Sequence, residues 1–242
     1  MSGDDVHQPP QFPPPLFPDP NTLCETCGYA LQGLAQRQAC PECGAAVYGS
    51  SPAYRPGLPW QNKRNVRAWL TTSFGALLGP GTSFRRLRIG GSNRSDRLFL
   101  GTWILVLSMA VFVDYQIERV SKPWLWAVIV ASGIPAATYI EALGITFFSY
   151  RRGWRVPFEL AERVACYASV GWMPAVLLLS QVQVAVDRGL LYRWWNPQWG
   201  PYTLAIDVVL SAVLLSIGVL WFEILIWIGV RKVRYGNAAS DG

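Results

Sequence analysis

Four cysteines near the start of the chain are the residues best suited to chemistry. They form two C-x-x-C pairs, Cys24 with Cys27 and Cys40 with Cys43, separated by twelve residues. Four thiolates at this spacing can meet at one tetrahedral point, and such a ligand set suits a structural Zn²⁺ ion. A closed site of this kind has no open coordination position, so the ion would stabilise its own loop and would not activate water. We therefore predict a zinc ribbon over residues 21–47.

A glycine follows the second cysteine of each pair. Gly28 and Gly44 can adopt a positive φ, which turns backbone amides toward the thiolate sulfurs. The segment carries few sizeable aliphatic residues, so it could not fold by apolar burial alone, and the metal-free head is expected to be disordered. A rubredoxin-like iron centre is the alternative. The short gap between the pairs disfavours it because it leaves little room for an aromatic core.

Enzyme signatures are absent from the sequence. There is no phosphate-binding glycine loop, no zinc-protease motif and no nucleophile elbow. The single histidine, His7, lies in a proline-rich stretch, so the commonest general base is missing from the rest of the chain. We expect a protein that is not an enzyme.

Four long apolar stretches predict transmembrane helices. Each is long enough to cross a hydrocarbon layer of about 30 Å at 1.5 Å per residue, and aromatic residues frame their ends. The predicted fold is an all-α transmembrane helical bundle of about four spans, in contact with the lipid bilayer, behind a small N-terminal zinc ribbon with four cysteine ligands. The spans cover Leu98–Tyr115, Trp124–Tyr150, Leu160–Val186 and Tyr202–Val230.

Several residues within the spans have predicted structural roles. Gly133 with Pro135 should kink the second span, and Gly171 with Pro174 the third. The small residues Ala136, Ala137, Gly144, Ser211 and Gly218 should allow close helix packing, and Cys166 should be a buried packing residue.

The rest of the chain divides by composition. Residues 1–20 are rich in proline and are predicted to form a disordered tail. Residues 48–62 are predicted to form a linker, and residues 236–242 a second disordered tail. Residues 63–97 predict an amphipathic segment in the membrane interface, with a short helix over 65–78. The transmembrane domain is assigned to residues 98–235.

The basic residues predict how the spans are oriented. Twelve flank one set of span ends and four the other, a clear positive-inside bias. Both termini and the cysteine head are thus expected on the cytoplasmic side of an inner membrane, where reduced thiols are the rule. This topology explains the net charge of +6, so no nucleic acid partner is expected. The N-terminus also lacks the pattern of a cleaved export signal, and none is predicted. The twelve are Arg85, Arg86, Arg88, Arg94, Arg97, Arg151, Arg152, Arg155, Arg163, Arg231, Lys232 and Arg234, against Arg119, Lys122, Arg188 and Arg193.

Two acidic residues fall inside the predicted spans. By helix rise, Glu141 lies about 15 Å and Glu223 about 12 Å from the cytoplasmic ends of their helices, so their side chains could meet. An ionisable group in hydrocarbon is costly and often functional. The two acids either line a polar or proton-linked pathway or hold the register of the bundle. Asp114 and Asp207 lie nearer the outer ends and are expected to be solvated.

Two parts of the sequence resemble known proteins. The head, from Cys24 through Gly44, resembles zinc ribbons fused to bacterial membrane proteins. The membrane part is similar to the Yip1 family at residues 84–87, at 164–169 leading to Pro174, and at 229–235. That family usually has five spans, and residues 66–90 would supply the fifth if they entered the membrane. The resemblance implies a multi-pass protein that organises membranes and binds protein partners, without catalytic residues.

Two functions remain open on the sequence. One is a zinc-headed membrane adaptor whose ribbon or proline-rich tail binds a protein partner and whose bundle could form a homo-oligomer. The other is a small carrier or channel that uses Glu141 and Glu223.

Overall fold

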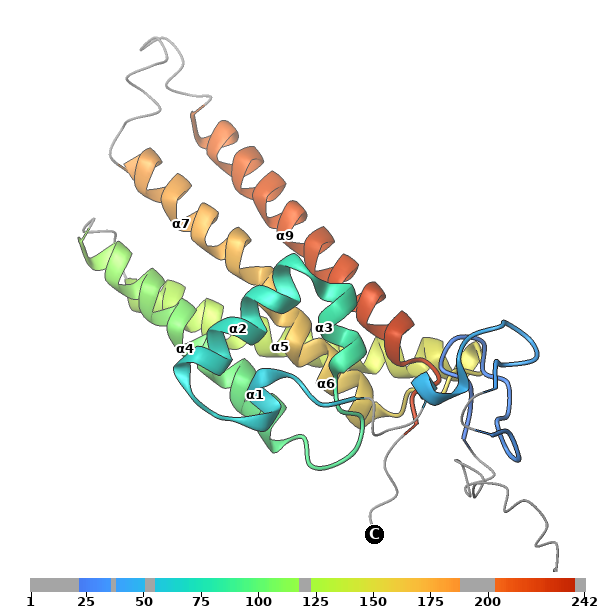
Figure 1. Ribbon diagram of the computed structural model, residues 1–242. Coiled ribbons are helices and arrows are strands. Elements are labelled where there is room, and N and C mark those ends of the chain that lie inside the picture. Colours follow the sequence, from blue (N-terminus) through green and yellow to red (C-terminus); the bar gives the residue numbers. More distant parts are fainter. Residues whose placement is uncertain (1–21, 36–37, 51–54, 118–122, 188–202, 238–242) are drawn as a thin grey trace, which may run out of the picture.

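The computed structural model describes residues 22–35, 38–50, 55–117, 123–187 and 203–237 (Figure 1). The predicted disordered tail at 1–20, part of the predicted linker, and the four basic residues assigned to the outer side lie outside these ranges. Within them the chain is helical, and extended backbone is limited to two isolated bridges in the cysteine head.

Four helical segments are long and apolar enough to cross a membrane, which confirms the predicted fold class. Three are single helices: α4 (Arg94–Ile117), α5 (Pro123–Arg151) and α9 (Thr203–Val233). The fourth is built from α6 (Phe158–Ala168) and α7 (Trp172–Asp187) in succession. The candidate spans within them are Arg94–Gln116, Trp124–Arg151, Phe158–Val182 and Val208–Val233.

The segment built from α6 and α7, the third span along the chain, is interrupted where a kink was predicted, whereas α5 continues as one helix through Gly133 and Pro135. A single 3-10 turn, η3 (Ser169–Gly171), separates α6 from α7. Pro174 cannot donate a backbone hydrogen bond, and Gly171 has no Cβ, so the regular ladder is weakest here. The absence of a side chain also admits α9, because a Cβ on Gly171 would lie 3.1 Å from the Cα of Phe222.

The long helices form two pairs that α6 joins. α4 packs along α5, α7 packs along α9, and α6 contacts α4, α5 and α9 (Figure 1). Two glycines of α9 allow close approach. Gly218 faces Ala175 of α7, as its predicted packing role requires, and a Cβ on Gly229 would lie 2.6 Å from Val164 of α6.

A helical hairpin lies against this bundle. It consists of α2 (Val66–Leu78) and α3 (Pro80–Arg86), joined at Gly79. The Asn65 side chain caps α2 by accepting a hydrogen bond from Ala68 N at 2.8 Å. α3 packs on α9, while α2 packs beside α4 through Trp69, whose ring lies 4.4 Å from that of Trp103.

The short helix α1 (Pro59–Asn62) precedes the hairpin. Its buried Trp60 contacts Phe99 and donates from Nε1 to the carbonyl of Ser95 at 2.7 Å. Residues 55–62, which the sequence assigned to a linker, therefore include a helix packed on α4. Trp69 and Ser73 of α2 both meet Trp103 of α4, and α2 also contacts α6 and η3, so α2 crosses α4 at Trp103.

The two faces of α2 are the reverse of those of a soluble helix. The fully buried residues of α2 are all small or hydroxyl residues, and most of its exposed residues are larger and apolar. Trp103 Nε1 donates to Ser73 Oγ at 2.9 Å, which satisfies both polar groups in the contact. The inward residues are Ala68, Thr72, Ser73 and Ala76, and the exposed ones are Val66, Leu70, Phe74 and Leu78.

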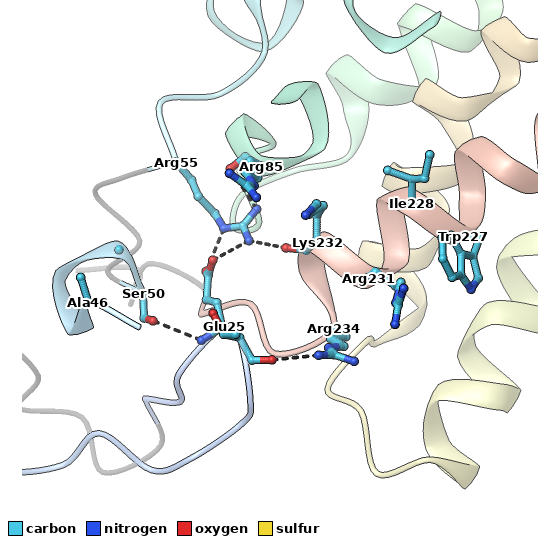
Figure 2. A pocket seen from close by; sticks show the side chains of 12 residues that line it. Glu25, Ala46, Ser50, Arg55, Arg85, Trp227, Ile228, Arg231, Lys232 and Arg234 are labelled. Atoms are coloured by element: carbon cyan, nitrogen blue, oxygen red, sulfur yellow. Dashed lines mark hydrogen bonds and ion pairs between the residues drawn. The ribbon is translucent and has the colours of Figure 1, made fainter. Parts of the chain in front are cut away.

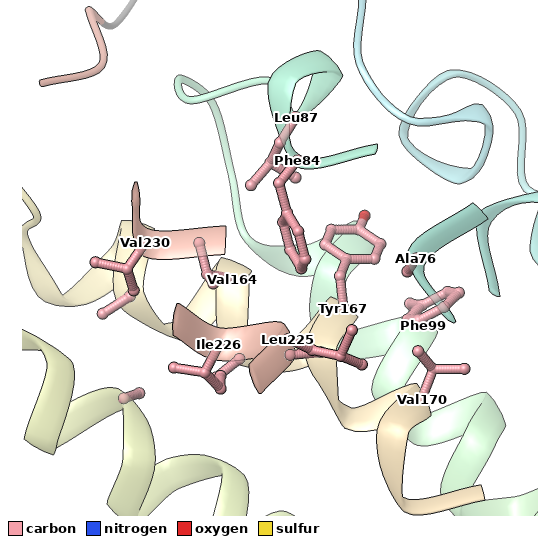
Figure 3. Packing of buried hydrophobic residues seen from close by; sticks show 14 of the residues in the cluster. Ala76, Phe84, Leu87, Phe99, Val164, Tyr167, Val170, Leu225, Ile226 and Val230 are labelled. Atoms are coloured by element: carbon pink, nitrogen blue, oxygen red, sulfur yellow. The ribbon is translucent and has the colours of Figure 1, made fainter. Parts of the chain in front are cut away.

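One apolar cluster connects these elements (Figure 3). Phe84 of α3 and Val164 of α6 both pack against Gly229 of α9. The ring centres of Phe99 on α4 and Tyr167 on α6 are 4.8 Å apart. Cys166 is buried on α6, as predicted. The cluster lies toward the end of the bundle where the hairpin and the cysteine head meet it, so this end is the best packed part of the protein.

Candidate metal centre and its junction with the bundle

The four predicted ligands come together at one point. All four sulfur atoms of Cys24, Cys27, Cys40 and Cys43 lie within 4.8 Å of one another, and none forms a disulfide. The Sγ atoms of Cys24 and Cys43 are 3.6 Å apart, as are those of Cys27 and Cys40. Tetrahedral zinc with Zn–S bonds of about 2.3 Å places its sulfurs about 3.8 Å apart, whereas a disulfide needs about 2.05 Å. The cluster therefore fits a tetrahedral metal ion.

The same backbone turn holds each cysteine pair. In the first, Gly28 N donates to Cys24 O at 2.8 Å; in the second, Gly44 N donates to Cys40 O at 2.8 Å. Both glycines have the positive φ expected from the sequence, 84° and 71°. We call residues 24–28 the first knuckle and residues 40–44 the second.

The head has only a small apolar core. Leu31 and Val47 are fully buried between the knuckles, and the other members of the cluster are mainly the cysteines themselves. So few buried side chains cannot offset the conformational entropy of ordering the head. An ion bound by the four cysteines and the contacts with the bundle would supply the remaining stabilisation.

The thiols differ in how readily they lose a proton. Burial, with the neighbouring thiols, raises the pKa of Cys27 to about 12. At Cys40, burial acts in the same direction, but hydrogen bonds from the backbone of Cys43 and Glu42 outweigh it and lower the pKa to about 7. A cation among four sulfurs stabilises every thiolate, so metal binding would release protons from this cluster.

An ion pair fastens the first knuckle to the bundle (Figure 2). Arg55 donates to both carboxylate oxygens of Glu25, from Nε at 2.9 Å and from Nη2 at 2.7 Å. The same guanidinium donates to the carbonyls of Phe84 and Leu87, where α3 ends, and to that of Lys232 near the end of α9. Arg55 is 5 % exposed, so this two-oxygen pair lies at a protected junction.

The residues after α9 complete the junction. The Asn237 side chain accepts from Leu23 N at 2.9 Å and donates to Leu23 O at 2.8 Å, in the manner of a strand partner. Arg234 Nη2 donates to Thr26 O at 2.8 Å. A Cβ on Gly28 would lie 2.9 Å from the ring of Tyr235, so a glycine is required here by the contact as well as by its φ. The head is therefore seated on the bundle.

The second knuckle has a different environment. Pro41, Glu42, Cys43 and Gly44 are exposed, and within the described parts of the chain they make no hydrogen bond or ion pair with the helices. The two knuckles have the same backbone turn, so the sequence pattern alone does not distinguish them. Only their placement makes one a docking element and leaves the other on the surface.

The structure also brings the two predicted intramembrane acids together. The carboxyl groups of Glu141 on α5 and Glu223 on α9 lie close enough to interact. Asp114 Oδ2 accepts a 3.4 Å contact from Gln181, and the side chain of Asp207 lies outside the described residues. A cavity of about 480 Å³ among the four spans is lined by neither Glu141 nor Glu223.

Sequence reasoning missed a buried polar cluster at the base of α4. Asp96 is fully buried and accepts from Arg163 Nε at 2.8 Å and from Tyr167 Oη at 2.6 Å. Nearby, Arg97 donates to Glu162 at 2.7 Å. In the sequence, Arg163 and Arg97 indicate only the orientation of the spans. Two acids close to two arginines at helix ends were the available signal.

Comparison with known proteins finds no match among protein-family models, curated proteins or solved structures.

Proposed function

We propose that this protein is a non-enzymatic membrane adaptor or organiser of a bacterial inner membrane, with a structural Zn²⁺ ion in a cytoplasmic head that binds a protein partner. We include the likeness to the Yip1 family in this proposal. The membrane location and the metal-bearing head are supported by the four candidate spans and by the closed set of four thiols. Four protein ligands complete a tetrahedral zinc site, which favours a structural role over a catalytic one.

The asymmetry of the head is the observation that carries the proposal. The first knuckle is seated on α3 and α9 through Glu25 and Arg55, so the head has a defined orientation on the bundle. The second knuckle then presents Pro41 and Glu42 outward. A surface that is held by metal on one side and by the bundle on the other is preorganised for a partner, which lowers the entropy lost on binding.

Crosslinking from the second knuckle tests the adaptor. A photoreactive amino acid at Glu42 should crosslink one defined protein in cells, and removal of residues 1–50 should abolish recovery of that protein while the bundle remains in the membrane. This deletion keeps Arg55 and Trp60, which are buried against the bundle. A matched probe at Tyr150, exposed in the last turn of α5, should not capture the same protein. Equal capture from both positions would overturn the proposal.

The carrier or channel is a second candidate because Glu141 and Glu223 lie close enough to interact between two spans. Ionisable groups within hydrocarbon are costly and often mark proton or ion pathways. Proton flux in liposomes should then fall in the Glu141→Gln/Glu223→Gln variant. Unchanged flux would leave the pair a role in helix packing alone.

A further inference from the structure

A cavity lies where the cysteine head meets the bundle (Figure 2). Its volume is about 780 Å³. The cysteine head forms one wall through the first knuckle and residues 46–50, Arg55 and Arg85 form a second, and the end of α9 with Arg234 forms a third. The cavity is thus bounded by segments that are far apart in the sequence.

The lining is strongly basic. Five cationic side chains surround the cavity, and the single carboxylate among its lining residues is Glu25, which is already bound to Arg55. Within the described ranges, the other four cations have no carboxylate within 4.0 Å. Like charges held this close repel one another unless an anion lies between them. The five are Arg55, Arg85, Arg231, Lys232 and Arg234.

Three of these cations are available to an anion. Arg55 is occupied by Glu25 and by carbonyls, and Arg234 donates to Thr26 O. Among the residues that the structure describes, the side chains of Arg85 and Lys232 have no hydrogen-bond or ion-pair partner. Both are therefore free to contact a ligand. The Arg231 guanidinium lies 4.4 Å from the centre of the Trp227 ring, a cation–π contact that orients it.

The position of the cavity indicates the kind of anion. The last candidate span ends at Val233, so Lys232 and Arg231 lie at the boundary between hydrocarbon and headgroups. Trp227 also lines the cavity and is 58 % exposed one helical turn deeper, where interfacial tryptophans lie. A ligand here meets cations at one end and an apolar surface at the other. Basic pockets at the cytoplasmic ends of spans bind anionic lipid headgroups.

We propose that this cavity binds the phosphate of an anionic phospholipid, with Arg85, Arg231 and Lys232 contacting the phosphate oxygens and the acyl chains lying over Trp227. The bound lipid would bridge α3 and α9 beside the docked first knuckle. The arrangement requires neither a protein partner nor transport, and so it stands apart from the proposed function.

Lipid binding by the purified, metal-loaded full chain tests the inference. Native mass spectrometry in detergent would compare phosphatidylglycerol with phosphatidylcholine. We expect retained phosphatidylglycerol, and a loss of affinity of about tenfold in the Arg85→Gln/Lys232→Gln variant. Both substitutions leave the backbone carbonyls that accept from Arg55 in place.

The Arg151→Gln/Arg152→Gln variant is the matched control, because it removes two arginines at an adjacent helix end without touching the cavity lining. It should change affinity less than twofold. An equal loss in both variants would show only general attraction to the membrane face and overturn the site. Glycerol 3-phosphate and inorganic phosphate form the last arm. If either binds as tightly as the lipid, the ligand is a soluble phosphate and the lipid assignment fails. Unchanged metal content and thermal midpoint show that each variant is folded.

Discussion

Arg163 and Asp96 form a completely buried ion pair between α6 and α4, with 2.8 Å between Nε and Oδ2. Side-chain exposure is 2 % for the arginine and 1 % for the aspartate. The segment before α4 wraps around the guanidinium and supplies four backbone carbonyls and the Asn93 side chain as acceptors. Every donor nitrogen of Arg163 thus has a partner, which a buried charge requires. The carbonyls belong to Arg88, Ile89, Gly90 and Gly91.

Removing one member of this pair should strongly destabilise the protein. We expect Arg163→Met to lower the free energy of unfolding by about 3–5 kcal/mol, because Asp96 is then left buried without its countercharge. Denaturation in mixed detergent micelles measures the change. Arg97→Met is the control: its pair with Glu162 has an arginine side chain that is 66 % exposed, so the loss should be below about 1 kcal/mol. Similar losses in both variants would contradict the role of burial.

The metal centre should depend on each cysteine of the cluster and not on the fifth. Cys40→Ser should lose the bound ion and leave residues 22–50 disordered, because the small apolar core is insufficient by itself. Elemental analysis of the purified protein should give one zinc per chain for the native sequence. Cys166→Ala, at a cysteine buried in the bundle, should retain it. Iron with visible absorption would contradict the zinc assignment.

Docking of the head should depend on Glu25. Glu25→Ala removes both acceptors of the Arg55 pair, and hydrogen bonds to charged groups contribute about 1.5–3 kcal/mol. Hydrogen exchange of the amides at Leu23 and Cys24 should therefore speed up about tenfold or more, with the metal content unchanged. Glu42→Ala on the exposed knuckle should leave the exchange rates as they are. If both variants exchange like the native protein, the ion pair does not hold the head.

The α2–α3 hairpin should enter the membrane from the cytoplasmic side. Trp69 contacts Trp103, which lies nine residues into α4 and so about 14 Å along it, and α2 continues past this contact to meet α6 and η3. The exposed apolar residues of α2 would then face acyl chains. A nitroxide amino acid at Leu78 should be more accessible to oxygen than to a nickel complex, and one at Lys63 the reverse. Higher nickel access at Leu78 would place the hairpin on the surface.

Local sequence patterns by themselves determined the helices and the metal ligands. The spacing of Cys24, Cys27, Cys40 and Cys43 defines a tetrahedral set whatever surrounds it, and Gly28 and Gly44 permit the required turn. Long apolar runs form helices because backbone groups in hydrocarbon must bond within their own segment. These properties depend on neighbours within a few residues.

Tertiary structure alone decided where those parts meet. Leu23 is bound by Asn237, 214 positions away, and Arg55 joins Glu25 to the last turn of α9. The sequence pattern does not show which knuckle docks, that Arg163 is buried, or that α2 turns its small residues inward. Each outcome depends on which distant part of the chain buries a polar or charged group and supplies its hydrogen-bond or ion-pair partner. Those partners come together only when the helices pack.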